Sequence, residues 1–285
     1  MIPKRIEMPV QVEEILGKLR EHGYEAFAVG GCVRDAILGR IPGDWDITTS
    51  AHPEEVKQVF GHTIDTGLQH GTVTVMRDHI GYEITTYRID GEYEDGRHPK
   101  EVVFTAELRE DLRRRDFTIN AMAYSHETGI VDIFGGAEDL AARRIRCVGD
   151  AGERFTEDAL RILRAVRFSA QLGFSIEKKT WQALCELAPS LVHVSKERVQ
   201  VELTKTLLSD RPEFIWKTEA AGLAPYISKT FPDVLAAWKK QKSCAKQSLE
   251  EKVCSKDVPA ADKDAIKTET VAQQGHMFVK HECET

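Results

Sequence analysis

The chain has 285 residues, of which 41% are hydrophobic and 30% charged, and its formal net charge is −7 at pH 7. This length leaves room for two domains with cores of their own, and the composition is that of a soluble globular protein. The negative charge excludes a generally basic nucleic-acid binder, and the lack of any run of about 18 apolar residues argues against a membrane span.

The cysteines and the N-terminus indicate the cellular compartment. None of the six cysteines forms a Cys-x-x-Cys pair with another. Unpaired thiols of this kind are typical of a reducing cytoplasm and give no sign of a zinc site. The N-terminal residues lack the apolar core of a signal peptide. We therefore expect a cytoplasmic protein.

The first predicted elements are a helix, a strand and a glycine turn. Residues 10–22 have the apolar spacing of an amphipathic helix, and residues 26–29 are typical of a short buried strand. The strand runs into Gly30 and Gly31, followed by a helix of roughly residues 33–38. Backbone N–H groups at such a junction can approach a polyphosphate. Alone, a Gly-Gly pair is most often only a loop.

Two aspartates, Asp44 and Asp46, follow one residue apart. In an extended strand they would project from one face, while Trp45 and Ile47 turn to the other. Neighbouring carboxylates repel unless a cation lies between them, and Mg²⁺ takes one or two carboxylates together with water and phosphate oxygens. An isolated Asp-x-Asp usually marks a solvated turn. Opposite a phosphate cradle, however, a metal-binding pair indicates nucleotidyl transfer.

A mixed sheet is predicted for the rest of the N-terminal half. Residues 50–60 are typical of a helix, and the alternating segments 72–76, 82–87 and 101–104 are typical of antiparallel strands. The polar loop at 90–99 is either an ordinary hairpin connection or a mobile flap over a site.

The pattern becomes helical after about residue 150. Before that point, residues 130–147 follow the order strand, Gly-Gly turn, short helix, strand. Helices are then predicted at 157–172, 178–187, 196–208 and 216–224. From about residue 239 charged and small polar residues dominate and no apolar period persists. We therefore expect this tail to lack a packed fold.

A basic run precedes Asp116, and Asn120 follows four residues later. The planar guanidinium of Arg115 suits phosphate, and Asp116 with Asn120 could bond ribose hydroxyls. A surface turn that leads into a core helix is the alternative.

The predicted helix that starts near Thr156, as its N-cap, carries Asp158 and Arg161 three residues apart on its polar face. A carboxylate acceptor beside a guanidinium donor can bond the Watson–Crick edge of C or A. The alternative is a solvated face with surface ion pairs worth under about 1 kcal/mol each.

In this order, the motifs resemble those of the class II CCA-adding tRNA nucleotidyltransferases and the related bacterial-type poly(A) polymerases. The resemblance covers about residues 5–225 and depends on five segments: 30–35, 43–48, 95–97, 114–120 and 157–161. It implies an α+β fold. A polymerase-β-type nucleotidyltransferase head with a mixed sheet would span 1–150, a helical neck and the start of a body 151–238, and a tail 239–285.

The resemblance also implies roles for single residues. Asp44 and Asp46 would be catalytic and hold two Mg²⁺ ions, and Glu83, on a strand that could abut them, could add a third carboxylate. Asp116 would help prefer ribonucleotides, while Asp158 and Arg161 would select C or A. The implied nucleotide-binding residues are Gly30, Gly31, Arg34, Arg115, Asp116, Asn120, Asp158, Arg161 and Arg164.

The implied reaction is the template-independent addition of C and A from CTP and ATP to the 3′ end of tRNA, with neither DNA nor a membrane as partner. The motifs do not separate it from poly(A) synthesis or from the addition of only C or only A. Family members continue into helical body and tail domains that hold tRNA, whereas patterned sequence here ends earlier. A truncated nucleotide-binding paralogue without efficient tRNA activity therefore stays open.

Overall fold

The computed structural model of the chain describes residues 3, 5–91 and 102–241. Most of the predicted loop at 90–99 and of the predicted tail at 239–285 lies outside the described residues. The chain divides into two compact units, Met1–Arg161 with Ser175–Ala183, and Ile162–Phe174 with Leu184–Thr285. The predicted head boundary near residue 150 stays a prediction. Across the described ranges, no helix combines the length and the apolar character that a membrane crossing needs.

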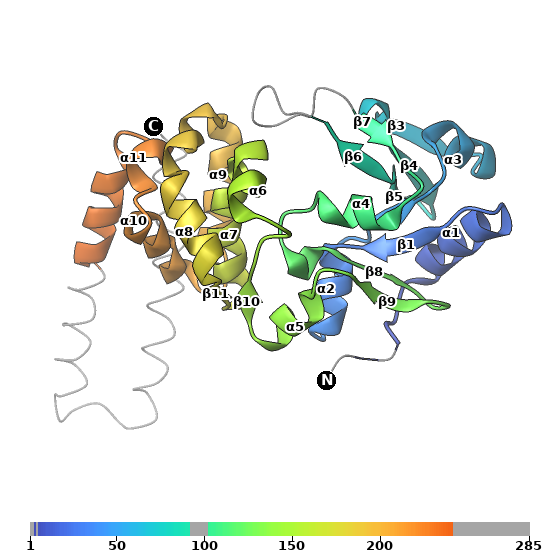
Figure 1. Ribbon diagram of the computed structural model, residues 1–285, viewed down its shortest axis with the longest axis horizontal. Coiled ribbons are helices and arrows are strands. Elements are labelled where there is room, and N and C mark those ends of the chain that lie inside the picture. Colours follow the sequence, from blue (N-terminus) through green and yellow to red (C-terminus); the bar gives the residue numbers. More distant parts are fainter. Residues whose placement is uncertain (1–2, 4, 92–101, 242–285) are drawn as a thin grey trace. The chain divides into compact units, whose positions relative to one another are not determined.

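The first unit is built on a seven-stranded sheet with the order β3-β4-β5-β2-β1-β8-β9 (Figure 1). Strands β2 and β5 run parallel and all other neighbours are antiparallel, so the predicted mixed sheet is confirmed. The strands are β1 (Ala26–Val29), β2 (Ile47–Thr49), β3 (Thr63–Gly67), β4 (Thr72–Arg77), β5 (Ile80–Thr86), β8 (Met122–Ser125) and β9 (Gly129–Asp132).

Two smaller sheets complete the strands of this unit. β6 (Arg88–Asp90) pairs antiparallel with β7 (Val102–Phe104), and β10 (Arg144–Ile145) pairs parallel with β11 (Ser175–Ile176). The prediction that the segment at 101–104 joins the main sheet is wrong. The reason is that β5 lies between β4 and β2, so it has no free edge to offer β7.

The following α-helices lie wholly within the first unit. They are α1 (Val10–Glu21), α2 (Gly31–Ile37), α3 (Pro53–Val59), α4 (Leu108–Arg113), α5 (Gly136–Ala141) and α6 (Ala151–Glu157). β1 sends alternate side chains into two cores: Ala26 packs in the cluster of α1 and α3, while Phe27 and Val29 pack with Leu112 of α4. The sheet therefore separates two hydrophobic layers, and the α4 side borders the candidate site described below.

Two predicted helices begin elsewhere than expected. α3 starts at Pro53 rather than residue 50, because His52 is its N-cap and its backbone N–H donates to Glu55, 2.6 Å away. The helix predicted at 157–172 ends as expected but begins at Leu160, and Thr156, its predicted N-cap, lies inside a separate helix, α6. α6 ends at Glu157, Asp158 is extended, and α7 (Leu160–Leu172) starts anew with Oδ1 of Asp158 accepting from the backbone N–H of Leu160 at 3.0 Å.

The second unit is helical. Beyond α7 the described helices are α8 (Lys178–Glu186), which begins in the first unit and ends in the second, α9 (Lys196–Leu207), α10 (Trp216–Ala220), α11 (Ala224–Ile227) and a last one at 231–241. The predicted helices at 178–187 and 196–208 are confirmed to within one residue. The helix predicted at 216–224 is two, because Gly222 adopts a φ of 70° between α10 and α11. Short 3₁₀ turns occur at Leu68–His70, Thr118–Asn120, Ala188–His193 and Pro212–Ile215.

Candidate active site

The segment that carries the two aspartates lies alongside β1. The backbone oxygen of Asp46 accepts from the N–H of Val29 at 3.0 Å, although β2 itself begins only at Ile47. The side chains of Trp45 and Ile47 pack in the core of α1 and α3. The predicted alternation is therefore confirmed, and the exposed side chains of Asp44 and Asp46 belong to the opposite face.

Glu83 occupies the matching position on the neighbouring strand. In the parallel pairing of β2 with β5, Ile47 lies opposite Ile84, so Asp46 and Glu83 both come one residue earlier and share a face. Both line a pocket of about 180 Å³. Its lining is Val29, Asp46, Ile47, Thr72, Glu83, Thr85, Arg88, Arg114 and Arg115. Carboxylates and guanidiniums thus face one small space.

The charges around Asp46 favour a cation. Asp46 is open to solvent, yet the protein around it removes part of its hydration and raises the pKa of its carboxyl. The charges of Asp44 and Glu83 also raise this pKa, and Arg115 lowers it. No group of three His, Cys, Asp or Glu side chains in the described part of the chain converges as a metal site. Two carboxylates with phosphate oxygens are the donor set that suits Mg²⁺.

The glycine turn brings Arg115 beside β1. Gly30 has a φ of 84°, and a Cβ built on it would lie 3.0 Å from Nη1 of Arg115. Its N–H donates to the backbone oxygen of Met122 at 3.0 Å, and its own oxygen accepts from the N–H of Arg34 at 3.1 Å. Only glycine combines this backbone conformation with room for the guanidinium.

Three predicted residues form one buried chain of hydrogen bonds. Nη1 of Arg34 donates to Oδ1 of Asn120 at 2.5 Å, and Nδ2 of Asn120 donates to Oδ1 of Asp116 at 3.1 Å. Arg34 also donates from Nε and Nη2 to the two oxygens of Asp35, both at 2.9 Å. Because both ends of the Asn120 amide are engaged, this residue orients Arg34 and Asp116.

Sequence reasoning missed the residues that hold the site arginines. Asp111, fully buried in α4, accepts from both Arg114 and Arg115, and the hydroxyl of Thr48 donates to it as well. The signal was present, since Asp111 stands three and four residues before the arginines, which follow directly on the end of α4. Without the fold, that spacing is indistinguishable from a surface ion pair.

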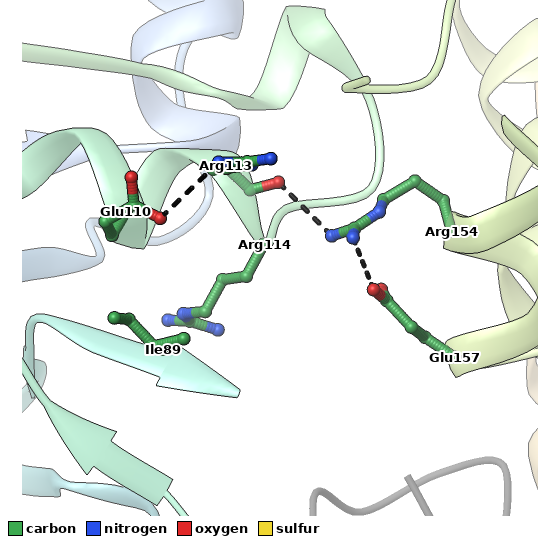
Figure 2. Close-up of a pocket in the computed structure, with 6 residues that line it drawn as sticks. All are labelled: Ile89, Glu110, Arg113, Arg114, Arg154 and Glu157. Atoms are coloured by element: carbon green, nitrogen blue, oxygen red, sulfur yellow. Dashed lines mark hydrogen bonds and ion pairs between the residues drawn. The ribbon is translucent and has the colours of Figure 1, made fainter. Parts of the chain in front are cut away.

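A second pocket, of about 260 Å³, shares Arg114 with the first (Figure 2). It is lined by Ile89, Glu110, Arg113, Arg114, Arg154 and Glu157. Figure 2 shows Arg154 of α6 between Glu157 and the backbone oxygen of Arg113, to which its Nη1 donates at 3.3 Å. Glu157 also accepts from Nη1 of Arg161 at 2.5 Å. One carboxylate thus holds two guanidiniums next to the end of α4.

The three remaining predicted residues do not share one helix face. Asp158 lies between α6 and α7, and the buried guanidinium of Arg161 donates from Nη2 to the backbone oxygen of Arg114 at 3.0 Å. Arg164 belongs to the second unit, where its guanidinium lies 5.3 Å from the ring centre of Phe168. Nucleotide contacts by these residues stay predictions.

Comparison with known proteins matches two parts of the chain. Residues 26–146 match the poly A polymerase head domain, and residues 173–227 match a domain described as a probable RNA and SrmB-binding site of polymerase A. The CCA-adding enzyme of Leuconostoc mesenteroides is 54% identical over 202 residues, which is 71% of this chain and 50% of that protein. The CCA-adding enzyme of Geobacillus kaustophilus is 52% identical over 193 residues, or 68% of this chain and 48% of that protein.

The chain belongs to the family of CCA-adding enzymes and bacterial-type poly(A) polymerases. The structure of the Bacillus stearothermophilus CCA-adding enzyme in complex with CTP aligns with a TM-score of 0.72 at 44% identity, over 78% of this chain and 54% of that one. The predicted fold, a nucleotidyltransferase head with a mixed sheet followed by a helical region, is that of the family and is confirmed. The chain spans about half the length of the curated relatives it matches.

Proposed function

We propose that the chain transfers C and A nucleotides from CTP and ATP to the 3′ end of tRNA. The observation that carries the proposal is the pocket in which Asp46 and Glu83 face Arg114 and Arg115. Carboxylates suit a divalent cation and guanidiniums suit phosphate oxygens, so this pocket fits a metal-bound triphosphate. Similarity to CCA-adding enzymes, one of them solved with CTP, supports this substrate class.

The metal of the proposed reaction is Mg²⁺. The family is one of nucleotidyltransferases that generally depend on a divalent metal. Asp44 and Asp46 would hold the ions, with Glu83 as a further carboxylate, because their charges already disfavour one another in the metal-free protein. Bound there, the metal would stabilise the charge that develops on the attacking and leaving oxygens of an in-line displacement.

The other proposed contacts assign the phosphates and the ribose of the nucleotide to particular residues. Arg115, whose Nη1 lies next to Gly30, would bind phosphate, and so would Arg34, whose Nη2 lies next to Gly31. Asp116, oriented by Asn120, would bind the ribose.

Base selection is proposed for the junction of α6 and α7. Asp158 would accept from the exocyclic amine of C or A, and Arg161, held by Glu157, would donate to the ring acceptors. Arg164 completes the proposed nucleotide-binding set.

The test is an incorporation assay with the full chain and tRNA that lacks its 3′ CCA. We expect C to be added from CTP alone, and A only when CTP and ATP are both present. A ladder of A from ATP alone would identify a poly(A) polymerase, and a product that stops after C an enzyme restricted to that base. CTP binding without any incorporation would identify a nucleotide-binding paralogue. Asp44→Asn and Asp46→Asn serve as inactive controls.

A further inference from the structure

Asp111 forms hydrogen bonds with both Arg114 and Arg115 and with Thr48 of β2. It lies in the first turn of α4, and its carboxylate is completely buried. Oδ1 accepts from Nε and Nη2 of Arg114 at 3.0 and 2.7 Å. Oδ2 accepts from Nη2 of Arg115 at 3.2 Å and from the hydroxyl of Thr48 at 3.1 Å. One carboxylate thus fixes two guanidiniums against β2.

The two arginines keep the Asp111 carboxyl ionised. Burial alone would raise the pKa of the Asp111 carboxyl, but the positive charges and hydrogen bonds of Arg114 and Arg115 outweigh it and hold the pKa below its ordinary value. Asp111 is therefore ionised at neutral pH. The carboxylate therefore meets both guanidiniums as a charged acceptor.

The positions of the two arginines show where they could meet a ligand. Arg115 reaches the glycine turn, since a Cβ on Gly30 would lie 3.0 Å from its Nη1, and it lines the same pocket as Asp46. Arg114 lines this pocket and also the second one. A buried carboxylate with guanidinium partners adds little net stability compared with apolar residues of similar volume. Packing alone therefore gives no reason for an acid at position 111.

We propose that Asp111 is a positioning residue for nucleotide binding. It holds Arg114 and Arg115 in the orientation in which they meet the phosphates of the incoming nucleotide, and it does not touch the nucleotide itself. This inference rests on the proposed function, because it assumes that the pocket of Asp46 takes a nucleoside triphosphate.

The test is the Asp111→Asn variant of the full chain, which keeps the shape of the side chain and removes its charge. We expect the Kd for CTP in the presence of Mg²⁺, measured by calorimetry, to rise about tenfold, equivalent to about 1.4 kcal/mol. Glu202→Gln is the matched control, because Glu202 is a buried acid of the second unit whose Oε2 lies 2.7 Å from Nε of Arg167. It should lose stability and keep the wild-type Kd.

A double-mutant cycle distinguishes a positioning role of Asp111 from a general loss of structure. In an Arg115→Ala background, Asp111→Asn should weaken CTP binding by less than about threefold, because one of the two guanidiniums that Asp111 positions is already absent. Thr48→Val, which removes one donor to Asp111, is the gentler variant and should weaken binding about threefold.

Three results would overturn the inference. The first is an unchanged Kd for CTP in Asp111→Asn, or in Thr48→Val if Asp111→Asn does not fold. The second is an undiminished tenfold loss in the Arg115→Ala background. Failure of the wild-type chain to bind CTP would overturn the proposed function and this inference with it, so the two failures are distinguishable.

Discussion

Replacing Gly30 with alanine perturbs the turn that joins β1 to α2. Gly30 has a φ of 84° and a ψ of −127°, a combination that L-amino acids rarely adopt. A side chain there costs about 1–3 kcal/mol of backbone strain. The new Cβ would also lie 3.0 Å from Nη1 of Arg115, so the guanidinium has to move. We expect the free energy of unfolding to fall by about 2 kcal/mol and the affinity for CTP to fall with it.

Gly23 provides the matched control for this substitution. Its φ is 85°, yet a Cβ built on it meets nothing within 4 Å. Gly23→Ala should therefore cost about 1–2 kcal/mol of strain and leave CTP binding unchanged. With a urea slope of about 1–3 kcal/mol per molar, a loss of about 2 kcal/mol lowers the midpoint by about 1 M. A wild-type midpoint for Gly30→Ala, or an equal loss of CTP affinity in both variants, would refute the reasoning.

Three further predictions concern charge. Because the pKa of Asp46 is raised by lost hydration and by Asp44 and Glu83, the metal-free protein should lose stability as the pH rises through that pKa. Asp46→Asn should accordingly raise Tm at neutral pH without metal while abolishing incorporation; a lower Tm would contradict this. The pKa of Asp111 is lowered, so its stabilisation is present above the ordinary carboxyl pKa and is lost as the pH falls through the folded value. Urea unfolding of Asp111→Asn should show that the free energy of unfolding is lower by about 3 kcal/mol at neutral pH, and that this difference shrinks in acid. A difference that does not depend on pH would count against the ion pairs of Asp111 with Arg114 and Arg115. Arg161→Ala should lower the preference for CTP over UTP about tenfold, the scale of one lost base contact, with a smaller change in KM; equal losses for all four nucleotides would speak against base reading.

Local patterns predicted most of the first unit because they depend on near neighbours. The alternation around Asp46 was enough to turn Trp45 and Ile47 into the core, and that assignment is confirmed. The helix at 10–22 and the strand at 26–29 were predictable from apolar spacing alone.

Two features were not predictable in the same way, a helix break that apolar spacing does not mark and a contact between distant residues. The apolar period continues across Asp158, so nothing in it marks the break between α6 and α7, which depends on the hydrogen bond from the N–H of Leu160. Asp111 accepts a hydrogen bond from Thr48 only because β2 brings Thr48 against α4. Sequence spacing does not give this second contact, since Thr48 and Asp111 are 63 residues apart and the fold brings them together.

The most direct test of the central claim is a crystal structure of the chain with CTP and Mn²⁺ in place of Mg²⁺. The account predicts an anomalous peak between the carboxylates of Asp44 and Asp46 and the α-phosphate, with Arg115 on the triphosphate. A triphosphate bound elsewhere, or a metal that contacts neither aspartate, would contradict it.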